Sequence, residues 1–171
     1  MINKKQLTER SFTPSQLSGF DGAHSIQLPV DFIHDLSKAD SLQAVLDTIA
    51  YWISHVFDAD RVSITLQDTE EYLKLYSISG NHAIPMDFKI PIGQTFVGRV
   101  FAQSQLIICD DLAQSDELDC KMLSEHGMGT CMDAPMIHNG VCIGTLNVAD
   151  INVNITTPYN KRFFYRVSPL G

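Results

Sequence analysis

Apolar residues recur every three or four positions between residues 30 and 57, which is the period of an amphipathic α-helix. The period is interrupted near residues 38–40, so two consecutive helices are predicted. Asp40 is a suitable N-cap for the second helix because Gln43 follows it at capping-box spacing. The apolar stripe of this helix consists of Leu42, Val45, Leu46, Ile49, Ile53, Val56 and Phe57.

Beyond residue 60 the apolar period becomes two, which is typical of β-strands with one buried face. Strands are predicted over residues 61–66, 72–78, 88–93, 106–109, 131–137 and 141–149. Two short helices are predicted between them, over residues 96–103 and 116–126. Asn139–Gly140 separates the last two strands and is a strong hairpin signal. This order of elements predicts an α+β fold with an antiparallel sheet.

The two ends of the chain show neither period. Residues 1–28 are interpreted as a leader or linker with weak structure, and residues 151–171 as an irregular tail. The 171 residues therefore predict one domain over residues 29–150.

Charge and hydropathy exclude several classes of partner. The net charge is -8, so the chain lacks the basic face with which proteins bind nucleic acids. No apolar run approaches the roughly 20 residues that span a bilayer, and no apolar segment follows the first lysines. We therefore expect a cytoplasmic protein that binds neither nucleic acid nor membrane.

The four cysteines are Cys109, Cys120, Cys131 and Cys142. They stand eleven residues apart, but the surrounding sequence does not repeat. Zinc sites use close pairs such as C-x-x-C, and the chain has none, so no metal site is predicted from spacing. We expect free thiols in a reducing compartment.

Three segments together resemble the GAF domain family. They are residues 90–100 (IPIGQTFVGRV), residues 107–116 (IICDDLAQSD) and residues 127–150, which contain APM, NG and IGTLNV. The resemblance implies a six-stranded antiparallel sheet with helices on both faces, related to the PAS fold. It also implies a pocket for a small molecule, in a sensory domain of bacterial-type signalling proteins such as sensor kinases or nucleotide cyclases.

The chain departs from specialised branches of that family. Asp150 and Ile151 stand where the cyclic-nucleotide-binding branch has an Asn-Lys pair. Lys121 follows Cys120, whereas a histidine usually follows the bilin-linking cysteine. The irregular tail also replaces the family's closing amphipathic helix. The ligand or cofactor therefore remains unidentified.

The pocket that the resemblance implies has eight candidate lining residues: Phe96, Cys109, Asp110, Asp111, Cys120, His126, Cys131 and Asp133. Asp133 is unusual because a carboxylate in a buried strand is costly unless it is paired. It is expected either to pair with backbone or with a charge such as Arg99, or to contact a ligand. Two further hypotheses are that several of these donors hold a mononuclear iron, or that His126 binds haem.

At three glycines a Cβ atom is expected to clash with neighbouring atoms or to strain the backbone. Gly93 and Gly98 are expected at a tight turn or a close backbone approach, and Gly144 at close packing of a strand against a helix.

We predict a sensory module whose ligand binding is coupled to a helix-mediated rearrangement of a dimer. Ala44, Tyr51 and Trp52 lie off the main stripe of the second helix and could pair across a two-fold axis, so a homodimer is expected. A ligand-free dimerisation module is the first alternative. A redox enzyme of the methionine sulfoxide reductase type, using Cys120 or Cys131, is the second. No catalytic motif is visible, so an enzyme is not expected.

Overall fold

A seven-stranded antiparallel sheet forms the centre of the computed structural model, which describes residues 8–13, 15 and 28–153. The strand order is β1-β5-β6-β7-β2-β3-β4. The strands are β1 Glu9–Phe12, β2 Arg61–Gln67, β3 Tyr72–Gly80, β4 Lys89–Pro91, β5 Leu106–Cys109, β6 Thr130–His138 and β7 Val141–Asp150. The predicted α+β class and antiparallel sheet are confirmed.

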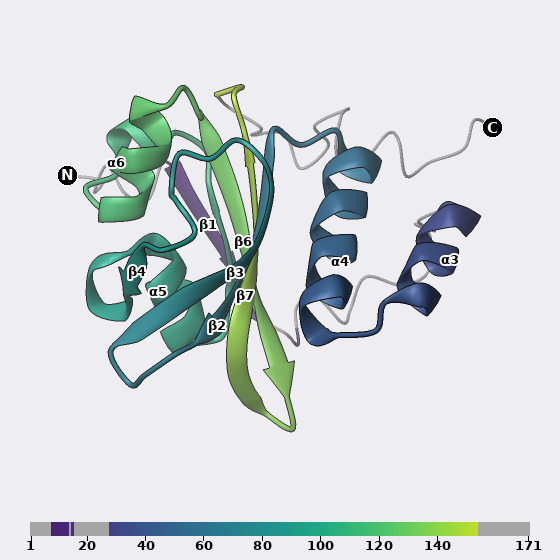
Figure 1. Ribbon diagram of the computed structural model, residues 1–171. Coiled ribbons are helices and arrows are strands. Elements are labelled where there is room, and N and C mark those ends of the chain that lie inside the picture. The colour runs from purple at the N-terminus through teal and green to yellow at the C-terminus, as the bar shows by residue number, and fades with distance from the viewer. Residues whose placement is uncertain (1–7, 14, 16–27, 154–171) are drawn as a thin grey trace.

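Helices cover both faces of this sheet, as predicted (Figure 1). Helices α3 (Val30–Lys38) and α4 (Leu42–Phe57) lie on one face. Helices α5 (Phe96–Gln103) and α6 (Leu118–Glu125) lie on the other. Two short 3-10 turns, η1 (Ile92–Gln94) and η2 (Leu112–Gln114), precede α5 and α6 respectively.

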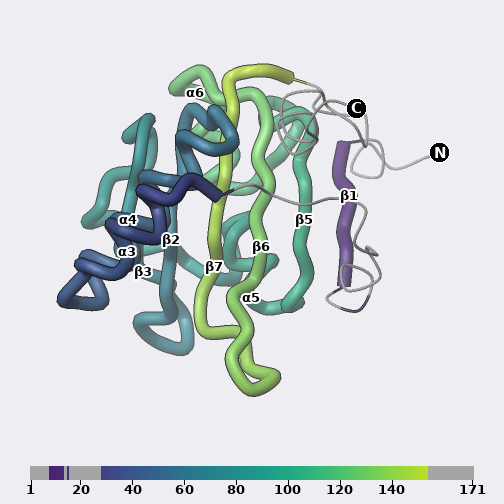
Figure 2. Tube along the Cα trace, turned by 90° about the vertical axis from the view of Figure 1, so that its right-hand side faces the viewer, coloured from purple at the N-terminus to yellow at the C-terminus, as the bar shows by residue number. Residues whose placement is uncertain are grey.

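The seventh strand, β1, comes from the segment for which weak structure was expected. Glu9 pairs with Cys109 and Phe12 with Leu106 at the edge of the sheet. Figure 2 shows β1 beside β5, far from α3. The expectation is wrong for these four residues because a strand this short is too brief for a period to show. Residues 1–7, 14 and 16–27 of the expected leader lie outside the described residues, as do residues 154–171 of the expected tail.

The N-cap of α4 is Ser41 and not Asp40. The Ser41 hydroxyl accepts a hydrogen bond from the backbone nitrogen of Ala44 at 3.2 Å. The inner face of α4 packs on the sheet through one compact cluster. Its buried members are Leu46, Ala50, Val62, Ile64 and Val148.

The second apolar edge of α4 is partly used within the chain. The Trp52 ring lies 6.2 Å from that of Phe32 in α3, and its indole nitrogen donates to Asp35 at 2.9 Å. Trp52 therefore fastens α3 to α4, whereas Tyr51 stays 49% exposed.

The glycine predictions have mixed outcomes. A Cβ on Gly98 would overlap the backbone of Ile92, so the expected close approach is confirmed there. A Cβ on Gly93 would meet nothing within 4 Å. At Gly144 the close neighbour is the backbone oxygen of Thr65 on β2, so this glycine allows contact between strands and not with a helix.

The described part of the chain contains no helix that is both long and apolar enough to cross a membrane.

Candidate functional site

A small cavity lies between the sheet and helices α5 and α6. Its volume is about 30 Å³. Its polar lining consists of Arg61, Ser63, Thr65, Asp119, Asp133 and Asn147. Its apolar lining includes Leu75, Ile84, Ile90, Val97 and Leu123.

Strand alternation brings these polar side chains together. On β2, Val62 and Ile64 belong to the cluster under α4, so Arg61, Ser63 and Thr65 face the cavity. Strand pairing then extends the polar row, because Asn147 of β7 lies opposite both Ser63 of β2 and Asp133 of β6. The result is a polar strip across three adjacent strands in an otherwise apolar layer.

Arg61 is buried at the rim of this strip. Its guanidinium donates to the backbone oxygen of Asn81 and, at 3.3 Å, to that of Ile84. Burial lowers the pKa of Arg61 to about 10, and the nearby Asp133 carboxylate partly offsets that effect. Sequence reasoning missed Arg61, although a charge at the start of a strand with buried character was a usable signal.

Asp133 is 4% exposed, and its carboxylate has no hydrogen bond to any described residue. Burial raises its pKa well above the ordinary value, and the charge of Asp119 adds to this, whereas Arg61 opposes it. The expectation of Arg99 as its charge partner is wrong. Arg99 instead contacts Glu117 at 2.8 Å and Glu9 at 2.9 Å. Arg61 is the cation that faces Asp133.

Asp119 joins the two helices that cover the cavity. Its carboxylate accepts hydrogen bonds from the backbone nitrogens of Phe96 and Val97, at 2.8 and 3.0 Å, at the start of α5. Burial raises the pKa of Asp119, and these hydrogen bonds oppose the rise. Asp119 was not among the predicted site residues, although it belongs to the acidic segment that follows β5.

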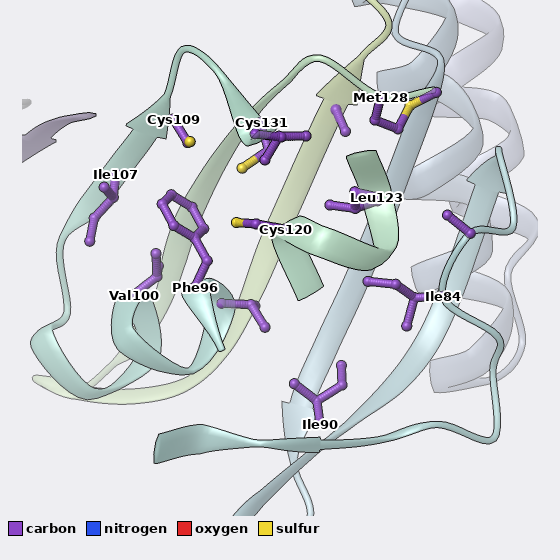
Figure 3. Close-up of a cluster of buried hydrophobic side chains, with 14 of the residues drawn as sticks. Ile84, Ile90, Phe96, Val100, Ile107, Cys109, Cys120, Leu123, Met128 and Cys131 are labelled. Atoms are coloured by element: carbon purple, nitrogen blue, oxygen red, sulfur yellow. The ribbon is translucent and has the colours of Figure 1, made fainter. Parts of the chain in front are cut away.

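Three of the four thiols converge beside the cavity (Figure 3). Cys109 is the last residue of β5, Cys120 lies in α6 and Cys131 is the second residue of β6, and all three are buried next to Phe96. Hydrogen bonds from the Cys120 and Cys131 thiols lower the pKa of Cys109. The contact with Cys109 raises the pKa of Cys120, and burial raises that of Cys131. The cysteines are all free, and Cys142 lies apart on β7.

The eight predicted pocket residues fall into three groups. Cys131 and Asp133 line the cavity. Phe96, Cys109 and Cys120 belong to the adjoining cluster of buried side chains. The other three have local roles: Asp110 pairs with Arg10, Asp111 caps η2, and His126 contacts the Met122 backbone oxygen at 2.8 Å.

The donors proposed for iron are therefore divided among separate places. Within the part of the chain that the structure describes, His, Cys, Asp and Glu side chains form no group of three or more that could hold a metal ion.

The sequence profile of the GAF domain family matches residues 41–167. No curated protein sequence matches the chain significantly. Solved structures share the fold at low identity. One is the GAF domain of a phosphoenolpyruvate-protein phosphotransferase from Acinetobacter, at 14% identity and a TM-score of 0.63, covering 80% of this chain and 82% of that one.

Two further structures with the same fold belong to proteins of different kinds. Free methionine-R-sulfoxide reductase from Neisseria meningitidis has 19% identity and a TM-score of 0.63, covering 81% of this chain and 84% of that one. The chromophore-binding domain of a bacteriophytochrome from R. palustris has 12% identity and a TM-score of 0.57, covering 81% of this chain and 56% of that one. These likenesses concern the fold alone.

Proposed function

Because this chain belongs to the GAF domain family, we propose that it is a regulatory module that binds a small molecule between its sheet and helices α5 and α6. The observation that carries this proposal is Asp133, a buried carboxylate without a hydrogen bond to any described residue at the wall of a cavity. Holding a charge in this way costs stability. Such a cost is commonly tolerated where the group serves binding.

The size of the cavity supports a coupling between binding and conformation. About 30 Å³ admits a group the size of one water molecule. A larger metabolite therefore has to displace α5 and α6, which move together because Asp119 joins them. A ligand that binds the displaced arrangement more tightly shifts the population toward it. The displacement of α5 and α6 would transmit ligand binding to the rest of a signalling protein.

The test is a thermal-shift screen of metabolites on the full chain, with native mass spectrometry and an absorption spectrum of the freshly purified protein. We expect at least one compound to raise the melting temperature in a saturable way, or a retained mass or visible band. Asn147→Leu, which replaces the polar amide at the cavity wall with an apolar group of nearly the same shape, serves as the control. If no compound binds and Asn147→Leu only stabilises the protein, the cavity is a packing defect and the proposal fails.

Exposed apolar residues on α3 and α4 support a homodimer as the signalling unit. Val30 is 82% exposed, and Ile33 and Tyr51 are about half exposed. A second copy that covers them would place α4 of each chain at the interface. Sedimentation velocity should give a dimer that Ile33→Lys converts to a monomer, and a monomer at all concentrations would contradict this.

Free thiols suit the reducing cytoplasm, where we place the protein.

The three converging thiols favour a second candidate function, the reduction of a small sulfoxide. Two thiols would reduce one sulfoxide to a sulfide and water while forming one disulfide, which balances atoms and electrons. Cys109 is the natural attacking group because its neighbours lower its pKa. The reduced protein would be mixed with free methionine-R-sulfoxide, and thiols counted after denaturation. Loss of two thiols in the wild type and in Cys142→Ser, but not in Cys109→Ser, would favour this reading. No loss in any of them would exclude it.

A further inference from the structure

The hydrogen-bond donors and acceptors around the cavity are not fully matched within the protein. This mismatch bears on the ligand of the proposed function, on which the inference rests. Several of the donors around the cavity are already used by the protein. Arg61 donates to two backbone oxygens, and Asn147 Nδ2 donates to Ser63 Oγ at 3.4 Å. The hydroxyls of Thr65 and Thr145 bond to each other at 2.6 Å.

At the cavity, two acceptor groups have no hydrogen-bond partner among the described residues. One is the carboxylate of Asp133, which is 4% exposed, and the other is the buried Oδ1 of Asn147. The two residues lie directly opposite each other on β6 and β7. Side chains in such pairs have Cβ atoms about 5 Å apart, so both acceptors can bind the same group of a ligand.

The features that would attract an anion are partly occupied. Asp119 accepts from the first amides of α5, and two of the Arg61 N–H groups donate to backbone oxygens. Two carboxylates, Asp119 and Asp133, and one guanidinium line the cavity, so the set carries one net negative charge when both carboxylates are ionised. One positive charge would balance this set. A hard metal ion fits poorly, because such ions take six or more oxygen ligands and only two acceptors are unpartnered.

We propose that the ligand presents a protonated amino group to Asp133 and Asn147. A primary ammonium carries three donors and no acceptor, and so complements two acceptors and a negative charge. Its head is about the size of a water molecule, which is the volume that the closed cavity offers. The smallest members of the class are ammonium and methylammonium, and a natural ligand carries a longer tail toward α5 and α6.

The experiment titrates the full chain with methylammonium chloride and follows the carboxyl carbon of Asp133 by NMR. Sodium chloride at equal ionic strength, neutral acetamide and anionic acetate are the comparison probes. A two-heavy-atom ligand binds weakly, with a Kd on the order of millimolar at best. We expect a saturable shift of the Asp133 signal with methylammonium and with none of the other three probes.

Two variants locate the site. Asp133→Asn should weaken methylammonium binding at least about tenfold, as the loss of a charge-assisted hydrogen bond implies. Asp116→Asn removes an equal charge from a side chain that is 97% exposed and should leave binding unchanged. If Asp133→Asn does not fold, the titration of the wild-type carboxyl signal still decides.

The failures are distinguishable. Saturation by acetamide or acetate without a response to methylammonium overturns the inference and leaves a binding module. No response to any probe also overturns the inference, and the metabolite screen then decides the proposed function separately.

Discussion

The carboxylate of Asp119 in α6 accepts a hydrogen bond at 2.8 Å from the backbone nitrogen of Phe96, the first residue of α5. It also accepts from the backbone nitrogen of Val97 at 3.0 Å. The amides at a helix start have no partner within the helix, so a neighbouring carboxylate is well placed to satisfy them. Two helices that are separate in sequence are thereby joined at one buried point above the cavity.

Replacing Asp119 with Ala should lower the free energy of unfolding by about 2–5 kcal/mol, because two buried N–H groups lose their acceptor. Urea denaturation followed by circular dichroism measures the change. Asp116→Ala, in the same acidic segment but exposed, should change little. A cost for Asp119→Ala as small as that of Asp116→Ala would show that water replaces the carboxylate without loss.

The ionisation of Asp133 should make stability fall as pH rises. Its folded pKa is raised above the ordinary 3.8, so the folded state binds more protons than the unfolded state between those two values. The unfolding free energy therefore decreases from pH 3.8 upward, by at most about 1.4 kcal/mol per pH unit, until the folded pKa is passed.

Asp133→Asn removes this contribution and should be the more stable protein at neutral pH. Denaturant titrations of both proteins across the pH range give the difference, which also includes the effect of the lost Asp133 charge on Asp119. A constant difference between the two proteins at every pH would contradict the raised pKa.

Gly98→Ala and Gly93→Ala form a matched pair five residues apart. A Cβ at Gly98 would overlap the Ile92 backbone, so this substitution should cost about 1–3 kcal/mol. Gly93 has open space and should tolerate Ala, with a neutral or slightly stabilising effect. The melting temperatures of the two variants measure this, and equal values would show that the turn before α5 adjusts freely.

Arg99→Ala should loosen β1 more than the rest of the sheet. The guanidinium bridges Glu9 of β1 and Glu117 beside α6, and its loss should cost about 1–3 kcal/mol. Hydrogen exchange should become faster at residues 9–12, with little change at β2. Lys121→Ala is the control, because its ion pair with Asp116 is exposed and 3.9 Å long. Unchanged exchange at β1 would mean that backbone pairing alone holds it.

Most of the fold could be predicted because its elements are periodic. The strand over 72–80, the hairpin at Asn139 and the helix from Phe96 each have a local signal in a few neighbouring residues. Strand β1 has four residues and no such signal, and its partner lies about 100 residues away. Its pairing depends on the finished edge of β5 rather than on its own composition.

The site was only partly predictable for a related reason. Asp133 is conspicuous as a charge in an apolar strand, but its surroundings depend on the register of three strands. That register brings Arg61 near it, whereas Arg99 lies on α5 and pairs with Glu117. Cys109, Cys120 and Cys131 were named as pocket candidates and Cys142 was not, but their contact with one another depends on how α6 packs against β5 and β6.

Strand β1 also has a consequence for how the chain folds during synthesis. Its residues are synthesised before those of β5, and Arg10 meets Asp110 only after 100 further residues have been added. Closing so long a loop is slow, and the strand contacts that stabilise the closed loop can form only after β5 and β6 have been made. Until then the outer edge of β5 offers unpaired backbone groups to other chains. Aggregation during expression should therefore depend on how quickly β1 reaches that edge.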